Sequence, residues 1–249
     1  MPGRSYAQGL TTSAAFGRPD LDLALEQHAA YCEALRACGL ELTLLAADER
    51  HPDGTFVEDT AVVAARVAVA TRPGALTREG EVSAVAAALR RFRPDLESIE
   101  APGTLDGGDV CQVEDHFLIG VSERTNELGA QQLAAILARH GYSSSLVDIR
   151  GHRTLLHLKS GISYLGDHRF TVSADAPGLE ALPGYERILA DEAESYAANC
   201  VRVNEFVLLA AGYPRLAARL DELDYAVRSL EVSEFQKMDG GLSCLSVRF

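Results

Sequence analysis

The 249-residue sequence has no tryptophan and no run of basic residues, and acidic side chains outnumber basic ones. Its 23 Lys and Arg stand against 36 Asp and Glu, a formal net charge of −13. A nucleic-acid surface needs clustered Lys and Arg to release counterions from phosphates, so this charge argues against a nucleic-acid partner. The same shortage of basic residues argues against binding to an anionic membrane surface.

Long apolar segments and cysteine pairs are also missing. No run of about 18 uncharged apolar residues and no basic-then-apolar leader is present, which predicts a cytoplasmic protein without a membrane span. The five cysteines show no C-x-x-C spacing, a pattern that favours reduced thiols over a disulfide framework or a structural zinc site. They are Cys32, Cys38, Cys111, Cys200 and Cys244.

The composition is otherwise that of a globular protein. Hydrophobic residues make up 47% and charged residues 24% of the chain, close to the averages for folded domains. No linker rich in Pro or Ser interrupts the sequence. We therefore predict one domain over residues 1–249.

Helical periodicity marks four segments. The clearest apolar stripe runs from Leu21 to Leu35 at gaps of three and four residues, with Asp20 as its expected N-cap and Gly39 at its expected end. The other stripes lie between Thr77 and Pro94, between Leu133 and Gly141, and from Pro214 to Leu223.

Short β-branched segments between these helices pair naturally as hairpins. The hairpin centres recur every 40 to 50 residues, roughly, so about five supersecondary units would fill the chain. A doubly wound sheet is the alternative at this point, because alternation of strands and helices alone does not separate the two folds. The hairpins pair Val62–Val63 with Val67–Val69, Val110–Val113 with Phe117–Ile119, Ile162–Leu165 with Phe170–Val172, and Val201–Val203 with Phe206–Leu209.

Cys244 is the cysteine whose setting suggests chemistry. It follows Gly240 and Gly241 in a turn that can bring backbone close to a ligand. A buried structural thiol is the alternative reading of this residue taken alone. The other four cysteines lie in apolar periodic stretches, whereas the loop around Cys244 favours exposure and activation.

A nucleophilic cysteine needs a proton-transfer partner, most often histidine. Among seven histidines, His157 lies between leucines, where loss of solvation would favour the neutral imidazole. His28 lies on an apolar helical stripe, and the remaining five lie in polar or turn contexts.

Two loops gather carboxylates. In PDGTFVEDT, which starts at Pro52, an extended backbone would point Glu58 and Asp59 to opposite sides. In LDGGD, which starts at Leu105, Asp106 and Asp109 flank a Gly-Gly turn. Such turns are ordinary in hairpins, but their acids can also pair with a cation such as a guanidinium group.

Eight segments in order give the chain a resemblance to the dimethylarginine dimethylaminohydrolases over essentially its whole length. The last segment contains Cys244 and the sixth contains His157. The segments are GLTTS from Gly9, PDGTFVEDT from Pro52, TRPGALTREGE from Thr71, APGTLDGGDV from Ala101, GVSERTNELG from Gly120, LLHLKSGISYL from Leu155, ESYAANCVRVNE from Glu194 and KMDGGLSCLSVRF from Lys237.

This resemblance implies a fold and a set of catalytic residues. The implied fold is α/β, a five-bladed propeller (pentein) built from ββαβ-type units. Cys244 is implied as the nucleophile, His157 as the general acid and base, and Asp106 as the acid that orients His157. Some bacterial relatives carry glutamate, one methylene longer, where this chain has Asp106.

The resemblance also implies the substrate contacts. Asp59 is the expected guanidinium-binding carboxylate, and Arg78 and Arg124 are the expected clamp for the substrate's α-carboxylate, a task suited to a planar bidentate donor. Asp53 and the backbone of Leu10 are expected near the substrate's amino group, and Glu58 and the backbone of Met238 complete the expected lining.

The implied activity is hydrolysis of asymmetric dimethylarginine or monomethylarginine to citrulline and an alkylamine, through a covalent thiouronium on Cys244. It needs no cofactor and no metal. The implied partner is the small methylated substrate, and relatives suggest a homodimer. Arginine deiminase and amidinotransferase are the nearest enzymatic alternatives, both normally longer. A non-catalytic protein that uses Cys244 as a redox sensor is the alternative from another class.

Overall fold

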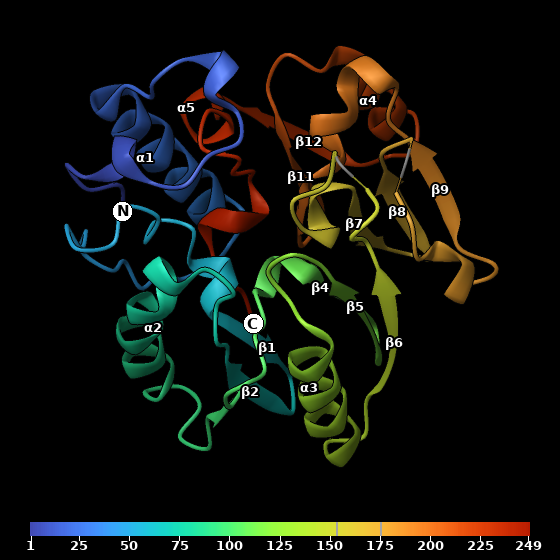
Figure 1. Cartoon of the computed structure of the whole chain (residues 1–249). Helices are drawn as coiled ribbons and strands as arrows, with labels where there is room; N and C mark the ends of the chain where they lie inside the picture. The colour runs from blue at the N-terminus through green and yellow to red at the C-terminus, as the bar shows by residue number, and fades with distance from the viewer. Residues whose placement is uncertain (153, 175) are drawn as a thin grey trace.

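Figure 1 shows five structural units arranged around a central axis. The computed structural model describes residues 1–152, 154–174 and 176–249. Within these ranges the strands form four separate three-stranded sheets, and the fifth unit is built from the two ends of the chain. Separate sheets exclude the doubly wound alternative and confirm the five-unit α/β-propeller.

All four sheets share one plan. The first two strands form an antiparallel hairpin, and the third lies parallel to the second. The four hairpins expected from the sequence are thereby confirmed. The strands are β1 (Ala61–Ala64), β2 (Val67–Ala70) and β3 (Glu97–Ser98); β4 (Val110–Val113), β5 (His116–Val121) and β6 (Ser143–Asp148); β7 (Ile162–Gly166), β8 (Arg169–Val172) and β9 (Glu186–Leu189); and β10 (Val201–Val203), β11 (Phe206–Ala210) and β12 (Ala226–Leu230).

The helices connect or flank these strands. Asp20 caps α1 (Leu21–Ala37) by accepting a hydrogen bond from the Leu23 N–H at 3.1 Å. Asn126 caps α3 (Glu127–Arg139) in the same way, with the Gly129 N–H at 2.8 Å. The remaining helices are α2 (Val82–Leu89), α4 (Pro214–Asp221), which has proline in its first turn, and α5 (Ser233–Gln236), which the sequence pattern did not predict.

The expected start of the second helix near Thr77 is wrong. Residues Leu76–Glu81 form 3-10 turns, and the α-helix begins only at Val82. Arg78, in these turns, is buried and bonded to acidic side chains, so a tertiary contact decides the local backbone.

The fifth unit brings the two ends of the chain together. It contains α1 and α5, and its core joins Tyr6 and Phe56 to Phe235, whose rings contact one another at centroid distances of 6.0 to 6.3 Å. The C-terminal residues then run to the centre of the molecule, as Figure 1 shows. None of the helices described is long and apolar enough to cross a membrane.

Candidate active site

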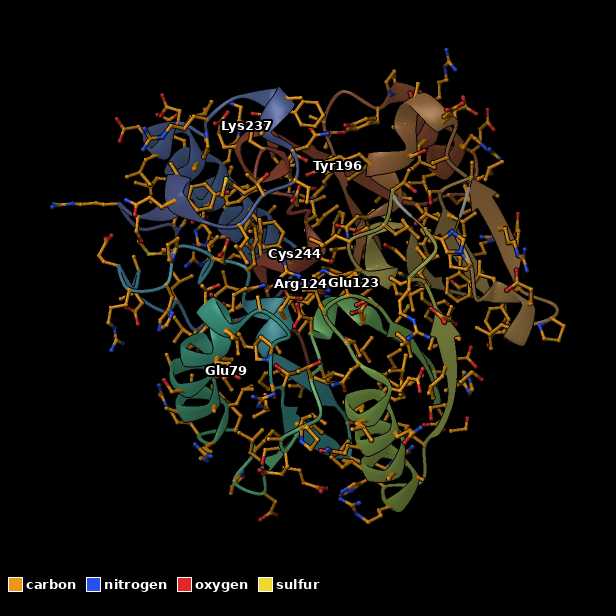
Figure 2. All side chains as sticks on the ribbon, in the orientation of Figure 1. Glu79, Glu123, Arg124, Tyr196, Lys237 and Cys244 are labelled. Atoms are coloured by element: carbon orange, nitrogen blue, oxygen red, sulfur yellow. The ribbon has the colours of Figure 1, made fainter. Side chains whose placement is uncertain are left out.

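Four short 3-10 turns meet at the centre of the propeller. They are η3 (Val57–Thr60), η5 (Gly107–Asp109), η6 (Leu158–Ser160) and η9 (Ser243–Leu245). Neighbouring residues of these turns face opposite ends of the propeller axis. Asp59 and Cys244 line one pocket, which we call the front pocket, whereas Glu58 and Ser243 line a second one, which we call the rear cavity. Figure 2 labels Cys244 and Arg124, both of which line the front pocket, near the centre of the molecule.

The front pocket collects nine of the ten residues expected in the site. Its volume is about 30 Å³, room for about one water molecule, so in this structure the pocket is too small for a methylated arginine. The expected residues are Leu10, Asp53, Asp59, Arg78, Asp106, Arg124, His157, Met238 and Cys244, and Phe56, Leu156, Asp239 and Gly240 join them.

His157 lies among carboxylates. Its Nε2 is 3.0 Å from Asp106 Oδ2 and 4.0 Å from Asp59 Oδ1. Burial lowers the pKa of His157, but Asp59, Asp109 and Asp106 outweigh burial and raise this pKa to about 9. The neutral imidazole expected from the surrounding leucines is therefore wrong. The shorter Asp106 side chain reaches the imidazole directly.

Asp59 is fixed from two sides. Arg78 Nη1 donates to Asp59 Oδ2 at 2.6 Å, and the Gly108 N–H donates to Oδ1 at 2.9 Å. Burial raises the pKa of Asp59, but His157 and Arg78 reverse that shift, so the pKa is lowered and the carboxyl is ionised. A Cβ at position 108 would lie 2.8 Å from both Asp59 Oδ1 and the His157 ring, so glycine permits this close approach.

The two arginines of the expected clamp differ in their surroundings. Arg78 is buried, and its guanidinium donates to Asp59, to Glu81 and to the Phe56 carbonyl. The Arg124 side chain makes no hydrogen bond to any residue that the structure describes, although it lines the pocket. Arg124 therefore has its guanidinium donors free for a ligand, whereas most of those on Arg78 are used.

A loop near the N-terminus lies over one end of the pocket. The Leu10 N–H donates to both carboxylate oxygens of Asp53, at 3.0 and 3.2 Å. Asp239 holds the same loop by accepting hydrogen bonds from the Thr12 N–H at 2.5 Å and from the Ser13 hydroxyl. Burial raises the pKa of Asp53.

Cys244 lies in η9 and is half-buried. The Gly241 N–H points to its Sγ at 3.4 Å. Asn199 holds the same turn, donating to Ser243 Oγ at 2.9 Å and accepting from the Ser243 N–H at 3.1 Å. Burial, followed by the charges of Glu58 and Asp59, raises the pKa of Cys244 to about 12, so the thiol is neutral in the empty site near pH 7.

Glu58 does not line the front pocket, and the expectation that it does is wrong. Its carboxylate accepts from Lys159 Nζ at 2.7 Å and from Ser243 Oγ at 2.7 Å, and all three residues line the rear cavity. The expected extended backbone is also wrong, because Glu58 and Asp59 belong to the 3-10 turn η3. That turn still sends the two side chains to opposite sides.

The sequence analysis missed the positioning role of Asp109, which it named only as an acid that could pair with a cation, and it missed Asp239 altogether. Asp109 is fully buried and accepts from the Ser122 and Thr125 hydroxyls and from the Leu158 N–H, next to His157. Asp239 has a positive φ of 59°. The Asp-Gly pair that starts at Asp239 was the available signal, since such pairs often adopt left-handed backbone.

Asp59, Asp106 and His157 have side chains of the types that bind metals, and their ligand atoms lie within 4.8 Å of one another. The oxygens are already used, by Arg78 and by the Gly74 N–H, which donates to Asp106 Oδ1 at 2.9 Å. With the His157 pKa raised to about 9, a proton occupies the imidazole near neutral pH. This arrangement fits proton transfer better than metal binding.

Comparison with known proteins finds relatives among enzymes that act on arginine and methylated arginine. The family model for arginine deiminase matches residues 86–180. The N(G),N(G)-dimethylarginine dimethylaminohydrolase of Pseudomonas aeruginosa is 46% identical over 249 residues, which cover 100% of this chain and 96% of that protein. The protein of the same name from Streptomyces coelicolor is 37% identical, with 99% and 94% covered.

Solved structures agree with these matches. A mutant of the dimethylarginine dimethylaminohydrolase from Pseudomonas aeruginosa, complexed with citrulline, superposes with a TM-score of 0.94 at 45% identity, with 100% of this chain and 96% of that chain covered. A dimethylarginine dimethylaminohydrolase adduct with S-methyl-L-thiocitrulline gives a TM-score of 0.95 at 44% identity, with the same coverage. The N-terminal domain of a cyanobacterial arginine dihydrolase is 18% identical with a TM-score of 0.88, which shows the shared fold.

Proposed function

The chain belongs to the dimethylarginine dimethylaminohydrolase family, and from this premise we propose how its residues carry out the family's reaction. The reaction is hydrolysis of Nω-methylated arginine to citrulline and an alkylamine through a covalent cysteine intermediate. One observation carries the assignment of residues: Cys244, His157 and two ionisable acids, Asp59 and Asp106, line a single pocket at the propeller axis.

Three charges in the pocket match three charges on the substrate. Asp59 would accept hydrogen bonds from the cationic guanidinium, which holds the guanidinium carbon in front of Cys244. Arg124 would bind the α-carboxylate with its free donors, while Arg78 acts mainly by fixing Asp59. Asp53 and the carbonyl groups of the Leu10 and Met238 backbone would receive the α-ammonium group.

The first chemical step forms a carbon–sulfur bond. A cationic guanidinium next to Cys244 favours the thiolate, which offsets the raised pKa of the empty site. Because His157 already carries a proton, the thiol proton passes to solvent as the substrate binds. The thiolate sulfur attacks the guanidinium carbon, and the bond from that carbon to the methylated nitrogen then breaks. His157, protonated near neutral pH because of its raised pKa, gives its proton to the leaving dimethylamine or methylamine.

The second step breaks the carbon–sulfur bond. His157, now neutral, accepts a proton from a water molecule that attacks the thiouronium carbon. The tetrahedral intermediate expels the Cys244 sulfur, and the ureido group of citrulline remains. The expelled Cys244 thiolate takes a proton from the ureido group as citrulline forms, and the free amine takes up the proton that the thiol had released to solvent. The alkylammonium ion thus carries away the positive charge of the substrate, and charge balances over both steps.

A parallel turnover assay tests the proposal. Citrulline release would be measured from asymmetric dimethylarginine, monomethylarginine and arginine, with dimethylamine detected for the first. We expect turnover of the methylated substrates and very slow turnover of arginine. Cys244→Ser should abolish turnover and keep most substrate binding, because a serine hydroxyl is far less acidic than a thiol. Persistent activity in this variant would contradict the mechanism.

Arginine deimination is the second candidate, because the arginine deiminase family model matches residues 86–180. That match covers less than half of the chain, whereas the full-length relatives are dimethylarginine dimethylaminohydrolases. Preferential turnover of arginine in the same assay would favour the deiminase. The single domain, the homodimer and the cytoplasmic location stay predictions from the sequence.

A further inference from the structure

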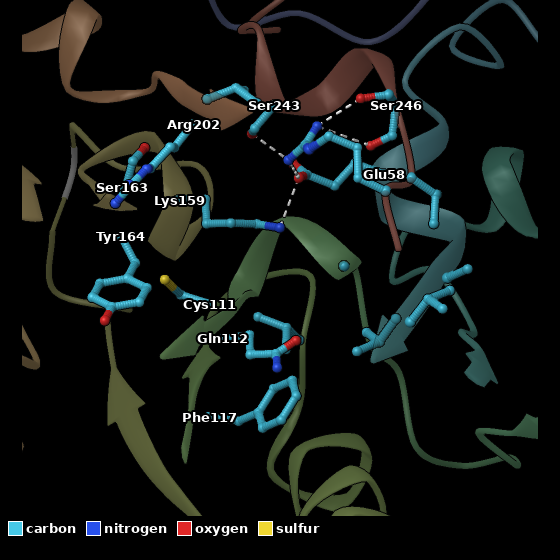
Figure 3. Close-up of a pocket in the computed structure, with 18 of the residues that line it drawn as sticks. Glu58, Cys111, Gln112, Phe117, Lys159, Ser163, Tyr164, Arg202, Ser243 and Ser246 are labelled. Carbon is cyan, nitrogen blue, oxygen red and sulfur yellow. Dashed lines mark hydrogen bonds and ion pairs between the residues drawn. The ribbon is translucent and has the colours of Figure 1, made fainter. Parts of the chain in front are cut away.

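A second cavity, on the rear side of the propeller axis, has a volume of about 430 Å³. Figure 3 shows it between the inner strands of the sheets, with Lys159 and Glu58 at its centre. Its walls come from β1, β4, β7 and β10, and the C-terminal residues Ser246–Arg248 close the remaining side. The proposed reaction uses none of the side chains of this cavity as a reactant.

The charges around Glu58, at the centre of the cavity, do not balance locally. Glu58 is the acid there, and it already accepts from Lys159 and Ser243. Arg248 Nη2 lies 4.0 Å from Glu58 Oε1, beyond hydrogen-bond distance. Within the described part of the chain, the Arg248 guanidinium donates hydrogen bonds only from Nη1, to the carbonyl and hydroxyl oxygens of Ser246. One carboxylate thus faces two cations.

The outer charges of the cavity have their own partners. Arg202 bonds to Asp167 and to the Leu165 carbonyl, and Glu114 accepts from the Tyr164 hydroxyl at 2.9 Å. Asp167 balances the charge of Arg202, whereas the Tyr164 hydroxyl does not balance the charge of Glu114. The two cations that face one carboxylate are therefore a local feature of the cavity around Glu58. In a protein with a net charge of −13, two cations beside one carboxylate in the same cavity are a specific feature.

We propose that the rear cavity binds a small oxyanion, a carboxylate or a phosphate, between Arg248 and Lys159. Arg248 would give its free Nη2 donors to the oxyanion in a charge-assisted hydrogen bond. Lys159 has three donors and uses one on Glu58, so it can bind the oxyanion without leaving Glu58. The cavity is large enough for an organic anion that fills more of its walls than inorganic phosphate does.

The site is coupled electrostatically to the nucleophile. Lys159 lowers and Glu58 raises the pKa of Cys244, and Ser243, which contacts Glu58, precedes Cys244 in the chain. An oxyanion bound in the rear cavity adds a negative charge near Cys244 and should therefore disfavour the thiolate. By reciprocity, formation of the thiolate weakens binding of the anion.

Binding of the oxyanion can be measured on the whole chain by methods that do not depend on catalytic turnover. The midpoint of thermal unfolding would be measured in inorganic phosphate, in acetate and in chloride at equal ionic strength, together with calorimetric titration of phosphate and acetate. We expect stabilisation by phosphate or acetate beyond that by chloride, and the stronger of the two identifies the class of oxyanion. Arg248→Gln should weaken this binding at least tenfold, because it removes a charged donor.

Control variants keep the test sharp. Arg50→Gln removes an exposed arginine that pairs with Asp48 outside the cavity, and it should retain the full stabilisation. Arg248→Lys keeps the cation and should retain part of the binding, which also serves if the glutamine variant does not fold. Equal stabilisation of wild type and Arg248→Gln, or no effect of either oxyanion beyond chloride, would overturn the proposal.

The coupling has its own readout. Alkylation of Cys244 by neutral iodoacetamide should slow when the oxyanion is bound, and Arg248→Gln should remove that slowing. If binding is observed but the alkylation rate does not respond, the coupling is wrong, although the site stands.

Discussion

Replacing Glu58 by glutamine should make Cys244 a stronger acid. Glu58 Oε2 is 2.7 Å from the hydroxyl of Ser243, the residue before Cys244, which puts the carboxylate roughly 7 Å from the sulfur. At an effective dielectric constant of about 20, removal of one charge at that distance is worth about 2 kcal/mol. One pKa unit corresponds to about 1.4 kcal/mol, so the pKa of Cys244 should fall by about 1.5 units from its value of about 12.

The kinetic effect is smaller than the shift in pKa. Below the pKa, the fraction of thiolate rises as the pKa falls, but a less basic thiolate is a weaker nucleophile, with a Brønsted coefficient of about 0.4–0.5. About half of the gain remains, so alkylation of the free enzyme by iodoacetamide at neutral pH should accelerate roughly five- to tenfold. The pH dependence of this rate gives the pKa directly.

Three further variants isolate the charge. Lys159→Met removes the partner cation and should raise the pKa of Cys244. The double variant with both changes should return toward wild type, because the pair is then neutral again. Glu114→Gln alters an acid that is 54% exposed in the same cavity and should leave the rate unchanged. An unchanged or raised pKa in folded Glu58→Gln would refute the electrostatic reasoning.

Three other outcomes follow from the contacts of the front pocket. The pKa of His157 rises from 6.5 to about 9 on folding, so protonation of this residue adds about 3 kcal/mol to the free energy of unfolding below pH 6.5, and this contribution is lost as the pH rises to 9. Urea unfolding at several pH values should show the loss, and His157→Gln should lack it. Asp106→Asn removes a charge that raises that pKa, so the decline of kcat at alkaline pH should begin at lower pH, and an unchanged decline would contradict the assignment. Asp239→Ala frees the loop at Thr12 and Ser13 and should raise KM for methylated arginine about tenfold, the cost of one or two lost hydrogen bonds, with a smaller change in kcat; equal loss in both constants would argue for a general structural defect.

Local sequence patterns predicted the elements whose stability is local. The hairpins appear at the expected positions because β-branched residues flank short polar turns. The helix at Leu21–Ala37 appears because a stripe of apolar residues and the Asp20 cap agree. The second helix started late because Arg78 is bound to Asp59, a contact between side chains 19 residues apart that periodicity does not encode.

The charges of the site depended on non-local contacts in the same way. His157 looked apolar in its sequence, since leucines flank it, yet its pKa is set by Asp59 and Asp106, which arrive from other turns. The location of Glu58 behind the pocket likewise depends on its pairing with Lys159, 101 residues away. The resemblance to a family could identify which residues belong near the axis, but not whether each one lines the front pocket or the rear cavity.

The opposite orientation of neighbouring residues gives the proposed reaction a way to release its product. A cationic substrate lowers the cost of a thiolate at Cys244, whose pKa in the empty pocket is about 12. Hydrolysis converts the guanidinium to a neutral ureido group, and the attraction of that group to Asp59 is lost together with its support of the thiolate. Since Glu58 remains behind the wall throughout and disfavours the thiolate, the thiol is protonated again once the substrate charge is gone. The same charges that make the empty enzyme unreactive therefore favour the departure of citrulline and restrict the reactive thiolate to the complex with a cation.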